Sequence, residues 1–418
     1  MNRRELVAGV AAAAASGRRA ARAAVAPRVV IVGGGYGGAS VARALRRIAP
    51  QVRVTLVERQ APFISCPRSN GVIGGLAEMG EITFGDAGLR EAGIGVVRGE
   101  AAEIDPAKRQ VRLAGGRRLE YDRLVLSPGV DFIWNGVEGY DEAASAAMPH
   151  AWKAGPQTLL LRDQLRAMPD GGLVVIAAPA DPYRCPPGPY ERACLIAGYL
   201  KREKPRSKIL ILDAKDSFSK QPLFQEAWTT LYPGMVEWVP ASRAGRVRSV
   251  RAGEGVVSTD FDDHRPAVAN IIPPQRAGAI ATKAGLAEAT GFCRVDPVTF
   301  ESKVAPGVHL VGDAIMPGDM PKSAFSANTQ GKACAYALAA IFRGETPAEP
   351  VLLNTCYSLA AADYGFTVAG VYKPLDGALR LVKGSGGISP VGADAGTHAL
   401  EAQYGRSWFD TLTAELYG

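Results

Sequence analysis

Several kinds of residue and pattern are scarce in this sequence of 418 residues. It has only four histidines, and they stand apart, with no spacing that is typical of metal ligands. Its six cysteines form no CxxC pair and no CxxCH sequence, which excludes a zinc ribbon and a covalently attached c-type haem in this chain. The sequence therefore predicts no bound metal.

Long apolar runs and basic blocks are also missing after residue 26. No later run is long enough to cross a membrane, so we expect no membrane-spanning segment. Residues 1–26 contain five arginines and one glutamate, and without them the formal charge falls from +7 to +3. A chain so nearly neutral is not expected to bind nucleic acid. With 47% apolar residues, it is expected to fold into two or three packed domains.

The first 26 residues have the pattern of an export signal. Arg3 and Arg4 precede a weakly apolar run, Leu6 to Ala15, and Ala24-Val25-Ala26 gives small residues before Pro27. This pattern predicts a twin-arginine signal and a periplasmic location, where disulfides form and persist. The alternative interpretation is a short amphipathic or disordered tail rich in alanine and arginine.

The strongest motif follows directly. Val29 to Val32 reads as a buried parallel strand, Gly33, Gly35 and Gly38 form GxGxxG, and a helix and the strand VRVTLVE come next. The glycines let the backbone approach a pyrophosphate at the start of the helix, and Glu58 at the end of the second strand can accept hydrogen bonds from a ribose. Tyr36 and Arg59 are the further candidate cofactor residues of this segment.

Two later segments favour FAD over a nicotinamide at this site. YDRLVLSPGVDF, with Ser127 and Gly129, has the form of the strand and turn that return the chain to an FAD domain. An apolar strand ends in Gly312-Asp313, and Lys322-Ser323 precede a helix. In this interpretation Asp313 holds the ribityl chain, and Lys322-Ser323 lie near the flavin ring. Together the motifs resemble the glutathione-reductase-like flavoprotein superfamily.

A second nucleotide-binding unit is expected, but its fingerprint is missing. GGLVVIAAPA and SKILILDAK read as its first two strands. Between them the chain has APADPYRCPPGPYE, whose prolines remove N–H donors and add bulk where the backbone must meet a pyrophosphate. A nicotinamide is therefore not expected to bind there, and Cys185 lies at the turn.

The segments RCPPGPYER (184–192) and NIIPPQRAG (270–278) resemble the flavoprotein subunit of flavocytochrome c sulfide dehydrogenase, and the resemblance covers nearly the whole chain after the leader. It implies that Cys66 carries FAD through a thioether, and that Cys185 and Cys356 form a redox-active disulfide that hydrosulfide attacks. It also implies a small inorganic sulfur substrate and a c-type cytochrome subunit as the electron acceptor.

Two expectations concern the residues around Cys185. The Cys-Pro-Pro turn at a helix N-terminus is expected to lower the pKa of the Cys185 thiol. Glu191 is either a proton relay beside the disulfide, as the resemblance implies, or a first-turn glutamate that serves only its own helix. Cys194, Cys293 and Cys334 lie in apolar or helical surroundings and are expected to be core thiols.

The predicted fold class is α/β, with two Rossmann-like domains of the three-layer FAD/NAD type and a C-terminal α+β interface domain. The expected divisions are the signal 1–26, the FAD-binding domain 27–145 and 269–349, the second Rossmann-like domain 146–268, and the interface domain 350–418. The alternatives for function are a sulfide:quinone oxidoreductase-like enzyme, a non-catalytic flavin-binding protein, and an NADH-dependent reductase, which the proline-filled turn disfavours.

Overall fold

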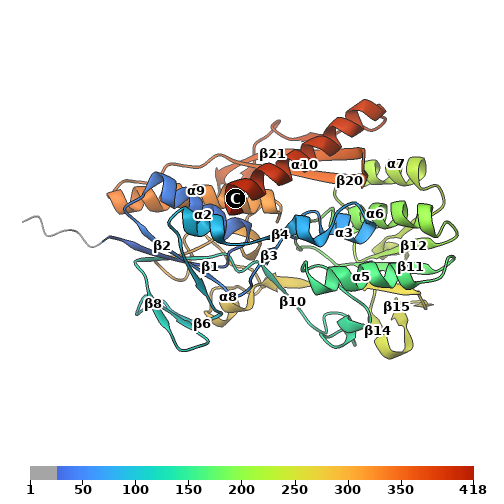
Figure 1. Ribbon diagram of the computed structural model, residues 1–418, viewed down its shortest axis with the longest axis horizontal. Helices are drawn as coiled ribbons and strands as arrows, with labels where there is room; N and C mark the ends of the chain where they lie inside the picture. Colours follow the sequence, from blue (N-terminus) through green and yellow to red (C-terminus); the bar gives the residue numbers. More distant parts are fainter. Residues whose placement is uncertain (1–25) are drawn as a thin grey trace, which may run out of the picture.

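A computed structural model of the chain describes residues 26–418, so the predicted export signal lies, apart from Ala26, outside the described residues. The described chain has three parts (Figure 1). One sheet with its helices lies at the N-terminal side, a second sheet with its own helices lies beside it, and a C-terminal sheet and helix extend across both. This arrangement confirms the predicted fold class.

The first part is built on a five-stranded parallel sheet with the order β19-β9-β1-β2-β5. The inner strands are runs of valine, isoleucine and leucine because both faces of the sheet are covered. The bounds of these strands are β1 (Arg28–Val32), β2 (Arg53–Glu58), β5 (Gly95–Arg98), β9 (Arg123–Leu126) and β19 (Val308–Leu310).

Helices α2 (Tyr36–Ile48) and α9 (Ala324–Arg343) pack against each other beside this sheet. They approach closely because Gly331 lies at the contact, where a Cβ atom would come within 2.6 Å of the carbonyl oxygen of Gly37. Ser323 caps the N-terminus of α9, because its hydroxyl oxygen accepts the N–H of Ser326 at 3.0 Å.

Smaller elements surround the first sheet. An antiparallel sheet and two short ribbons are formed by β6 (Ala101–Asp105), β7 (Gln110–Leu113), β8 (Arg118–Glu120), β3 (Phe63–Ile64), β4 (Thr83–Phe84), β10 (Val130–Phe132) and β18 (Gln275–Ala277). The short helices are α3 (Ser69–Gly74), α4 (Ala87–Glu91) and α8 (Ala279–Lys283).

The second part has a parallel sheet with the order β13-β12-β11-β17. Its strands are β11 (Leu173–Ala178), β12 (Lys208–Asp213), β13 (Val236–Val239) and β17 (Val268–Ile271), and its helices are α5 (Pro156–Ala167), α6 (Gly188–Glu203) and α7 (Gln221–Leu231). An antiparallel sheet accompanies it, with β14 (Ser249–Arg251), β15 (Val256–Ser258) and β16 (Asp263–His264). Strand β17 extends this part a few residues past the expected boundary at 268.

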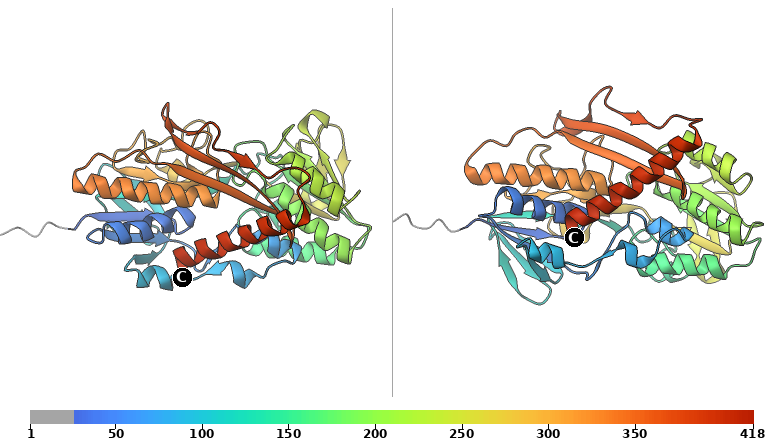
Figure 2. Two further views of the ribbon diagram at one scale, coloured as in Figure 1. Left: turned by 90° about the horizontal axis from the view of Figure 1, so that it is seen from above. Right: turned by 45° about the horizontal axis from the view of Figure 1, so that its top comes forward.

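The C-terminal part consists of an antiparallel sheet and one long helix. Its elements are β20 (Leu352–Ala361), β21 (Tyr364–Leu375), β22 (Ala378–Leu381), β23 (Gly387–Ile388) and α10 (Ala395–Tyr417). Figure 2 shows α10 running from the second part back to the first, so that the C-terminus lies beside α2. Arg43 of α2 fixes this end, because its Nε atom donates to the carbonyl oxygen of Leu416 at 3.1 Å.

Between residues 26 and 418 the structure has no helix that combines the length and the hydropathy needed to span a bilayer. Within the same range, no three histidine, cysteine or acidic side chains gather in a way that could hold a metal ion.

Candidate active site

The glycine motif forms the tight turn that a dinucleotide requires. Gly33 has φ +100°, and a Cβ atom there would lie 2.2 Å from the carbonyl oxygen of Ser127. A Cβ atom on Gly38 would lie 1.9 Å from the carbonyl oxygen of Gly33. Helix α2 begins directly after Gly35, and no side chain of the described residues caps it. Its first N–H groups therefore remain available to a pyrophosphate.

Glu58 lies at the end of β2 beside this turn. Its Oε2 atom accepts the N–H of Gly34 at 2.6 Å, and its Oε1 atom accepts the N–H of Gln60 at 2.7 Å. These two bonds fix the carboxylate, while each oxygen keeps a lone pair for a ribose hydroxyl. Arg59, the next residue, is exposed. Burial by itself raises the pKa of Asp131, but the ion pair with Lys153 lowers it, and the charge of Arg59 adds a smaller effect in the same direction.

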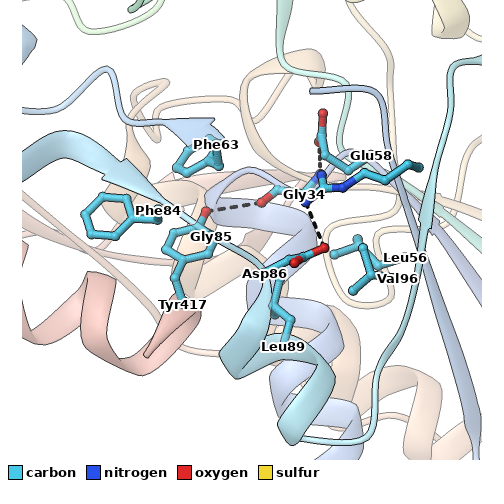
Figure 3. A pocket seen from close by; sticks show the side chains of 11 residues that line it. Gly34, Leu56, Glu58, Phe63, Phe84, Gly85, Asp86, Leu89, Val96 and Tyr417 are labelled. Carbon is cyan, nitrogen blue, oxygen red and sulfur yellow. Dashed lines mark hydrogen bonds and ion pairs between the residues drawn. The ribbon is translucent and has the colours of Figure 1, made fainter. Parts of the chain in front are cut away.

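A pocket lies against Gly34 and Glu58, and the C-terminus of the chain forms one wall of it (Figure 3). Tyr417 stacks on Phe84 and Phe63, with ring centroids 5.4 and 4.9 Å apart, and its hydroxyl donates to the carbonyl oxygen of Gly34 at 3.1 Å. The sequence analysis missed Tyr417, because no local motif relates it to a glycine turn 383 residues away.

Asp313 gives the second test of a dinucleotide site. In the part of the chain that the structure describes, its Oδ1 atom is buried without a hydrogen-bond partner, and burial raises the pKa of this carboxyl group. Such an acceptor is costly unless a donor reaches it, and the hydroxyls of a ribityl chain are suitable donors. The turn before it is fixed by Gly312, whose N–H donates to Oε1 of Gln330 at 2.8 Å. These residues fit FAD.

The remaining predicted cofactor residues lie around this site. The Ser127 hydroxyl faces Gly37 and Gly312, and Gly129 lies two residues further on with φ +64°. Tyr36 begins α2, and its hydroxyl lies 2.7 Å from the Ser65 hydroxyl, next to Cys66.

The ammonium of Lys322 is directed away from solvent. It donates to the carbonyl oxygen of Asp313 at 2.9 Å and lies 3.8 Å from the centroid of the Phe292 ring. Burial lowers the pKa of Lys322 to about 8. Ser323, the next residue, donates its hydroxyl to Oδ1 of Asn354 at 2.6 Å.

Arg184 connects the predicted cysteines with the cofactor residues, and the sequence analysis gave it no role. Its guanidinium donates to the carbonyl oxygen of Trp152, and the Cys66 thiol lies 3.8 Å from the same oxygen. Burial by itself lowers the pKa of Arg184, but Cys66, Asp313 and Cys185 around it raise the pKa above its usual value. One half-buried cation therefore lies among all three groups.

Cys185 has the left-handed backbone conformation, with φ +57°, and its N–H donates to the carbonyl oxygen of Lys322 at 2.8 Å. Its sulfur packs on the first turn of α6, 3.2 Å from where a Cβ atom on Gly188 would lie. The pKa of this thiol is raised, first by burial and then by Cys356 and Glu191. The expectation of a lowered pKa is therefore wrong, because burial disfavours the thiolate and the charges of Cys356 and Glu191 add to this effect.

Cys356 lies on β20, in the C-terminal part of the chain, and the fold brings it to Cys185. Helix α6, which follows Cys185, packs on β20, and the charge of Cys356 contributes to the raised pKa of Cys185 after burial. Glu191 and Lys220 are charged neighbours of both thiols. Burial raises the pKa of Cys356 as well. Both cysteines are free thiols in the structure, and no disulfide forms among residues 26–418. Their pairing stays a prediction.

Glu191 faces the cysteine site and not the end of its own helix. Its Oε1 atom accepts the N–H of Leu359 on β20 at 3.0 Å, and its Oε2 atom accepts Nδ2 of Asn70 at 2.8 Å. Burial raises the pKa of Glu191. Both carboxylate oxygens are bonded outside α6, so the helix-capping interpretation does not account for this residue. Cys194, Cys293 and Cys334, in contrast, are buried thiols.

At the position equivalent to a nicotinamide site, the acidic residue is bonded within the protein. Asp213, at the end of β12, occupies the place where the second unit would bind a ribose, and its side chain is fully buried. It accepts Nζ of Lys215 at 2.7 Å and Nε1 of Trp238 at 3.0 Å. The acidic residue is therefore present, but its oxygens already have partners.

Comparisons with known proteins agree with this architecture. The model described as pyridine nucleotide-disulphide oxidoreductase matches residues 27–154. Residues 158–273 match "Sulfide dehydrogenase [flavocytochrome c] flavoprotein chain, central", and residues 348–417 match "Flavocytochrome c sulphide dehydrogenase, flavin-binding". The fold and the site thus define a flavin-binding oxidoreductase of the pyridine nucleotide-disulphide oxidoreductase class. The chain belongs to the family of flavoprotein chains of flavocytochrome c sulfide dehydrogenase, which confirms the resemblance found in the sequence.

Individual relatives include a flavoprotein chain of the same family and a sulfide-quinone reductase. A stretch of 37 residues, 9% of this chain, is 58% identical to the flavoprotein chain of flavocytochrome c sulfide dehydrogenase from Chlorobaculum thiosulfatiphilum and covers 77% of that sequence. Sulfide-quinone reductase from Aquifex aeolicus (strain VF5) is 29% identical over 174 residues, which are 41% of this chain and only 39% of that one.

Among solved structures, the sulfide:quinone oxidoreductase of Aquifex aeolicus is similar with a TM-score of 0.72 at 19% identity, over 93% of this chain and 92% of that chain. The putidaredoxin reductase in its covalent complex with putidaredoxin is similar with a TM-score of 0.67 at 17% identity, over 90% and 93%. At these identities the similarity concerns the fold.

Proposed function

We propose that this chain is a periplasmic sulfide dehydrogenase that binds FAD, covalently through Cys66, and passes electrons to a c-type cytochrome. The observation that carries the proposal is the packing of α6, which follows Cys185, on β20, which holds Cys356, with Glu191 and Lys220 both bonded to that strand beside residues that fit FAD. Family membership supports the same activity.

The chemistry at the cysteines follows from thiol–disulfide exchange. When Cys185 and Cys356 are oxidised to a disulfide, hydrosulfide attacks one sulfur. A new S–S bond forms to that cysteine, the old S–S bond breaks, and the other cysteine leaves as a thiolate. The hydrosulfide sulfur is oxidised, and the cysteine pair takes up two electrons. FAD, when bound, would supply a group that accepts an electron pair and can release the two electrons one at a time.

The residues around the pair have separable roles in this proposal. Glu191 accepts the proton released from the persulfide, because its carboxylate is held at the site and burial raises its pKa. The positive charge of Arg184 stabilises negative charge at Cys185. The acceptor is external because the sequence has no CxxCH haem motif and, in the described chain, the oxygens of Asp213 are bonded to protein groups instead of a nicotinamide ribose.

An anaerobic titration with sulfide, followed by the visible spectrum of the flavin, tests the proposal. We expect bleaching in the wild type and in Cys194→Ala, whose cysteine lies buried elsewhere on α6, and a loss of at least tenfold in the bleaching rate in Cys185→Ser and Cys356→Ser. A flavin that stays oxidised in the wild type contradicts the proposal and favours a non-catalytic flavin-binding protein.

Two further measurements test the details. After acid precipitation, flavin is expected to remain with the wild-type polypeptide and to be released from Cys66→Ser. Turnover with a soluble c-type cytochrome is expected to exceed turnover with a short-chain quinone, and the reverse order favours a quinone-reducing enzyme. Cell fractionation of full-length protein, compared with Arg3→Lys/Arg4→Lys, tests the predicted export.

A further inference from the structure

Lys220 is a buried lysine that the sequence analysis did not identify. It is 4% exposed, and its Nζ atom donates to the carbonyl oxygen of Cys356 and to the hydroxyl oxygen of Ser358, both at 2.7 Å. Within residues 26–418, both hydrogen-bond partners of this nitrogen are neutral. A buried ammonium with only neutral partners is costly, so its site is suited to a neighbouring negative charge.

The thiol of Cys356 lies on the same side of β20 as this ammonium. Alternate residues of a strand point to the same face of a sheet, so Cys356 and Ser358 project together. Because Lys220 bonds to the Ser358 hydroxyl and to the backbone of Cys356, its charge lies on the thiol's side of the strand.

The backbone holds Lys220 in this position. Its φ is +62°, an uncommon value for a lysine, and its carbonyl oxygen accepts the N–H groups of Leu223 and Phe224, each at 3.1 Å, at the start of α7. The ammonium also lies 5.5 Å from the centroid of the Phe366 ring on β21. The side chain thus extends from the second part of the fold into the C-terminal sheet.

The charged groups around the two sulfurs are arranged unequally. Glu191 of α6 raises the pKa of both thiols. Arg184 and Lys220 both lower the pKa of Cys185, whereas only Lys220 of these two cations lowers the pKa of Cys356, to whose backbone it is hydrogen-bonded. The other titratable group that faces Lys220 is Glu401 of α10. In thiol–disulfide exchange, the sulfur whose thiolate is better stabilised is the better leaving group.

We propose that Lys220 is a positioning residue that stabilises the thiolate of Cys356, so that hydrosulfide attacks Cys185 and Cys356 is the sulfur that leaves. This inference rests on the proposed function. In the step, a bond forms between the hydrosulfide sulfur and Sγ of Cys185, the Cys185–Cys356 bond breaks, and both electrons of that bond remain on Cys356. The Cys185 persulfide proton passes to Glu191.

The first test measures how fast the single remaining cysteine of the pair is alkylated as a function of pH, with the modified peptide quantified by mass spectrometry. In Cys185→Ser protein, Lys220→Met is expected to raise the midpoint of the pH profile for alkylation of Cys356 by at least one pH unit. Below the midpoint, this shift corresponds to a tenfold loss of the alkylation rate. Lys220→Arg is expected to restore it. In Cys356→Ser protein, the Cys185 midpoint is expected to move less.

Lys204→Met is the matched control. Lys204 also donates to a backbone carbonyl, that of Arg166 at 2.8 Å, but far from the cysteines, so its loss is expected to leave the Cys356 profile unchanged. A Cys356 profile that is the same with and without Lys220 overturns the inference. Loss of a merely structural Lys220 would not raise the midpoint, because water admitted by a loss of packing would lower the pKa of a buried thiol.

The second test locates the persulfide. Oxidised wild-type protein is mixed anaerobically with one equivalent of sulfide, alkylated and digested. The inference expects the persulfide on Cys185 and the plain alkylated thiol on Cys356, and the opposite distribution overturns it. A persulfide on neither cysteine contradicts the proposed function itself, and the alkylation profile then still decides whether Lys220 acts on Cys356.

Discussion

Tyr190 donates its hydroxyl to Oδ2 of Asp213 at 2.5 Å, which joins the helix after the Cys-Pro-Pro turn to the end of the second strand of the second sheet. The Tyr190 ring also stacks on Phe218, with centroids 3.6 Å apart. The oxygens of Asp213 are thereby engaged at the place where an acidic residue would otherwise meet a ribose. The second nucleotide-binding unit therefore has the parallel sheet of a Rossmann-like domain, but its acidic residue bonds to protein groups.

NADH and NADPH are therefore expected not to reduce the flavin. Mixing the oxidised enzyme with either nucleotide in a stopped-flow spectrometer should leave the flavin absorbance unchanged over seconds, while sulfide bleaches it. Rapid bleaching by a nicotinamide would mean that the hydrogen bonds to Asp213 open, and it would favour the alternative function of an NADH-dependent reductase.

Asp213 is also expected to be important for stability. Asp213→Ala leaves the ammonium of Lys215, whose side chain is only 10% exposed, without its carboxylate partner. Breaking a buried pair in this way typically costs about 3–5 kcal/mol. Chemical denaturation of the variant measures the loss, and Asp170→Ala, which removes a surface partner of Arg206, is the control and should change little. Equal losses in the two variants would contradict the expected importance of the buried pair.

Tyr417 is expected to contribute to FAD affinity, because it forms a wall of the pocket beside Gly34. In a Cys66→Ser background, from which FAD can dissociate, Tyr417→Ala removes two stacked aromatic contacts and should raise the Kd for FAD roughly tenfold. Tyr417→Phe keeps the ring and should have a smaller effect.

Fluorescence titration of FAD measures both variants. Tyr404→Ala serves as the control, since Tyr404 lies on the same helix but is 50% exposed. If Tyr417→Ala binds FAD as tightly as its parent, the C-terminus closes the pocket without contributing to cofactor binding.

Lys322 makes stability depend on pH in the alkaline range. Burial lowers its pKa to about 8 in the folded protein, against an ordinary value of 10.5. Below pH 8 the folded state bears the cost of a buried ammonium, and between pH 8 and 10.5 only the unfolded state binds the proton, so stability rises with pH in this window. The gain is on the order of 3 kcal/mol.

Comparison with Lys322→Met measures this effect. The free energy of unfolding of the wild type, relative to the variant, is expected to increase from pH 7 to pH 10. Lys303→Met, at a surface pair with Asp296, should give a difference that does not change with pH in this way. Parallel curves for wild type and Lys322→Met would show that the ammonium is not penalised by burial.

The glycine turn shows what a sequence motif can predict. The roles of Gly33 and Gly38 follow from backbone sterics over a few residues, and the structure places both where a Cβ atom would collide with backbone. The loss of the second fingerprint could be recognised in the same way, because prolines act locally. Asp213 was within the strand identified from the sequence, but its burial and its partners depend on residues of α6 and β13.

The pKa of Cys185 shows where local reasoning failed. A helix N-terminus lowers a thiol pKa when the thiol is solvated, but here burial and the charges of Cys356 and Glu191 dominate. Cys356 lies on a strand that is distant in the sequence, so its effect could not be obtained from the turn alone.

The sequence by itself determined the fold class, the first nucleotide turn, the loss of the second and the family, because each depends on short segments with fixed backbone geometry. Only the tertiary structure decided that Lys220 meets Cys356 across 136 residues and that Tyr417 meets Gly34 across 383. Such contacts are set by how sheets and helices pack, and one sequence carries no local signal for them. The unequal charges around the two cysteines belong to this second group, since they arise only where three parts of the fold come together.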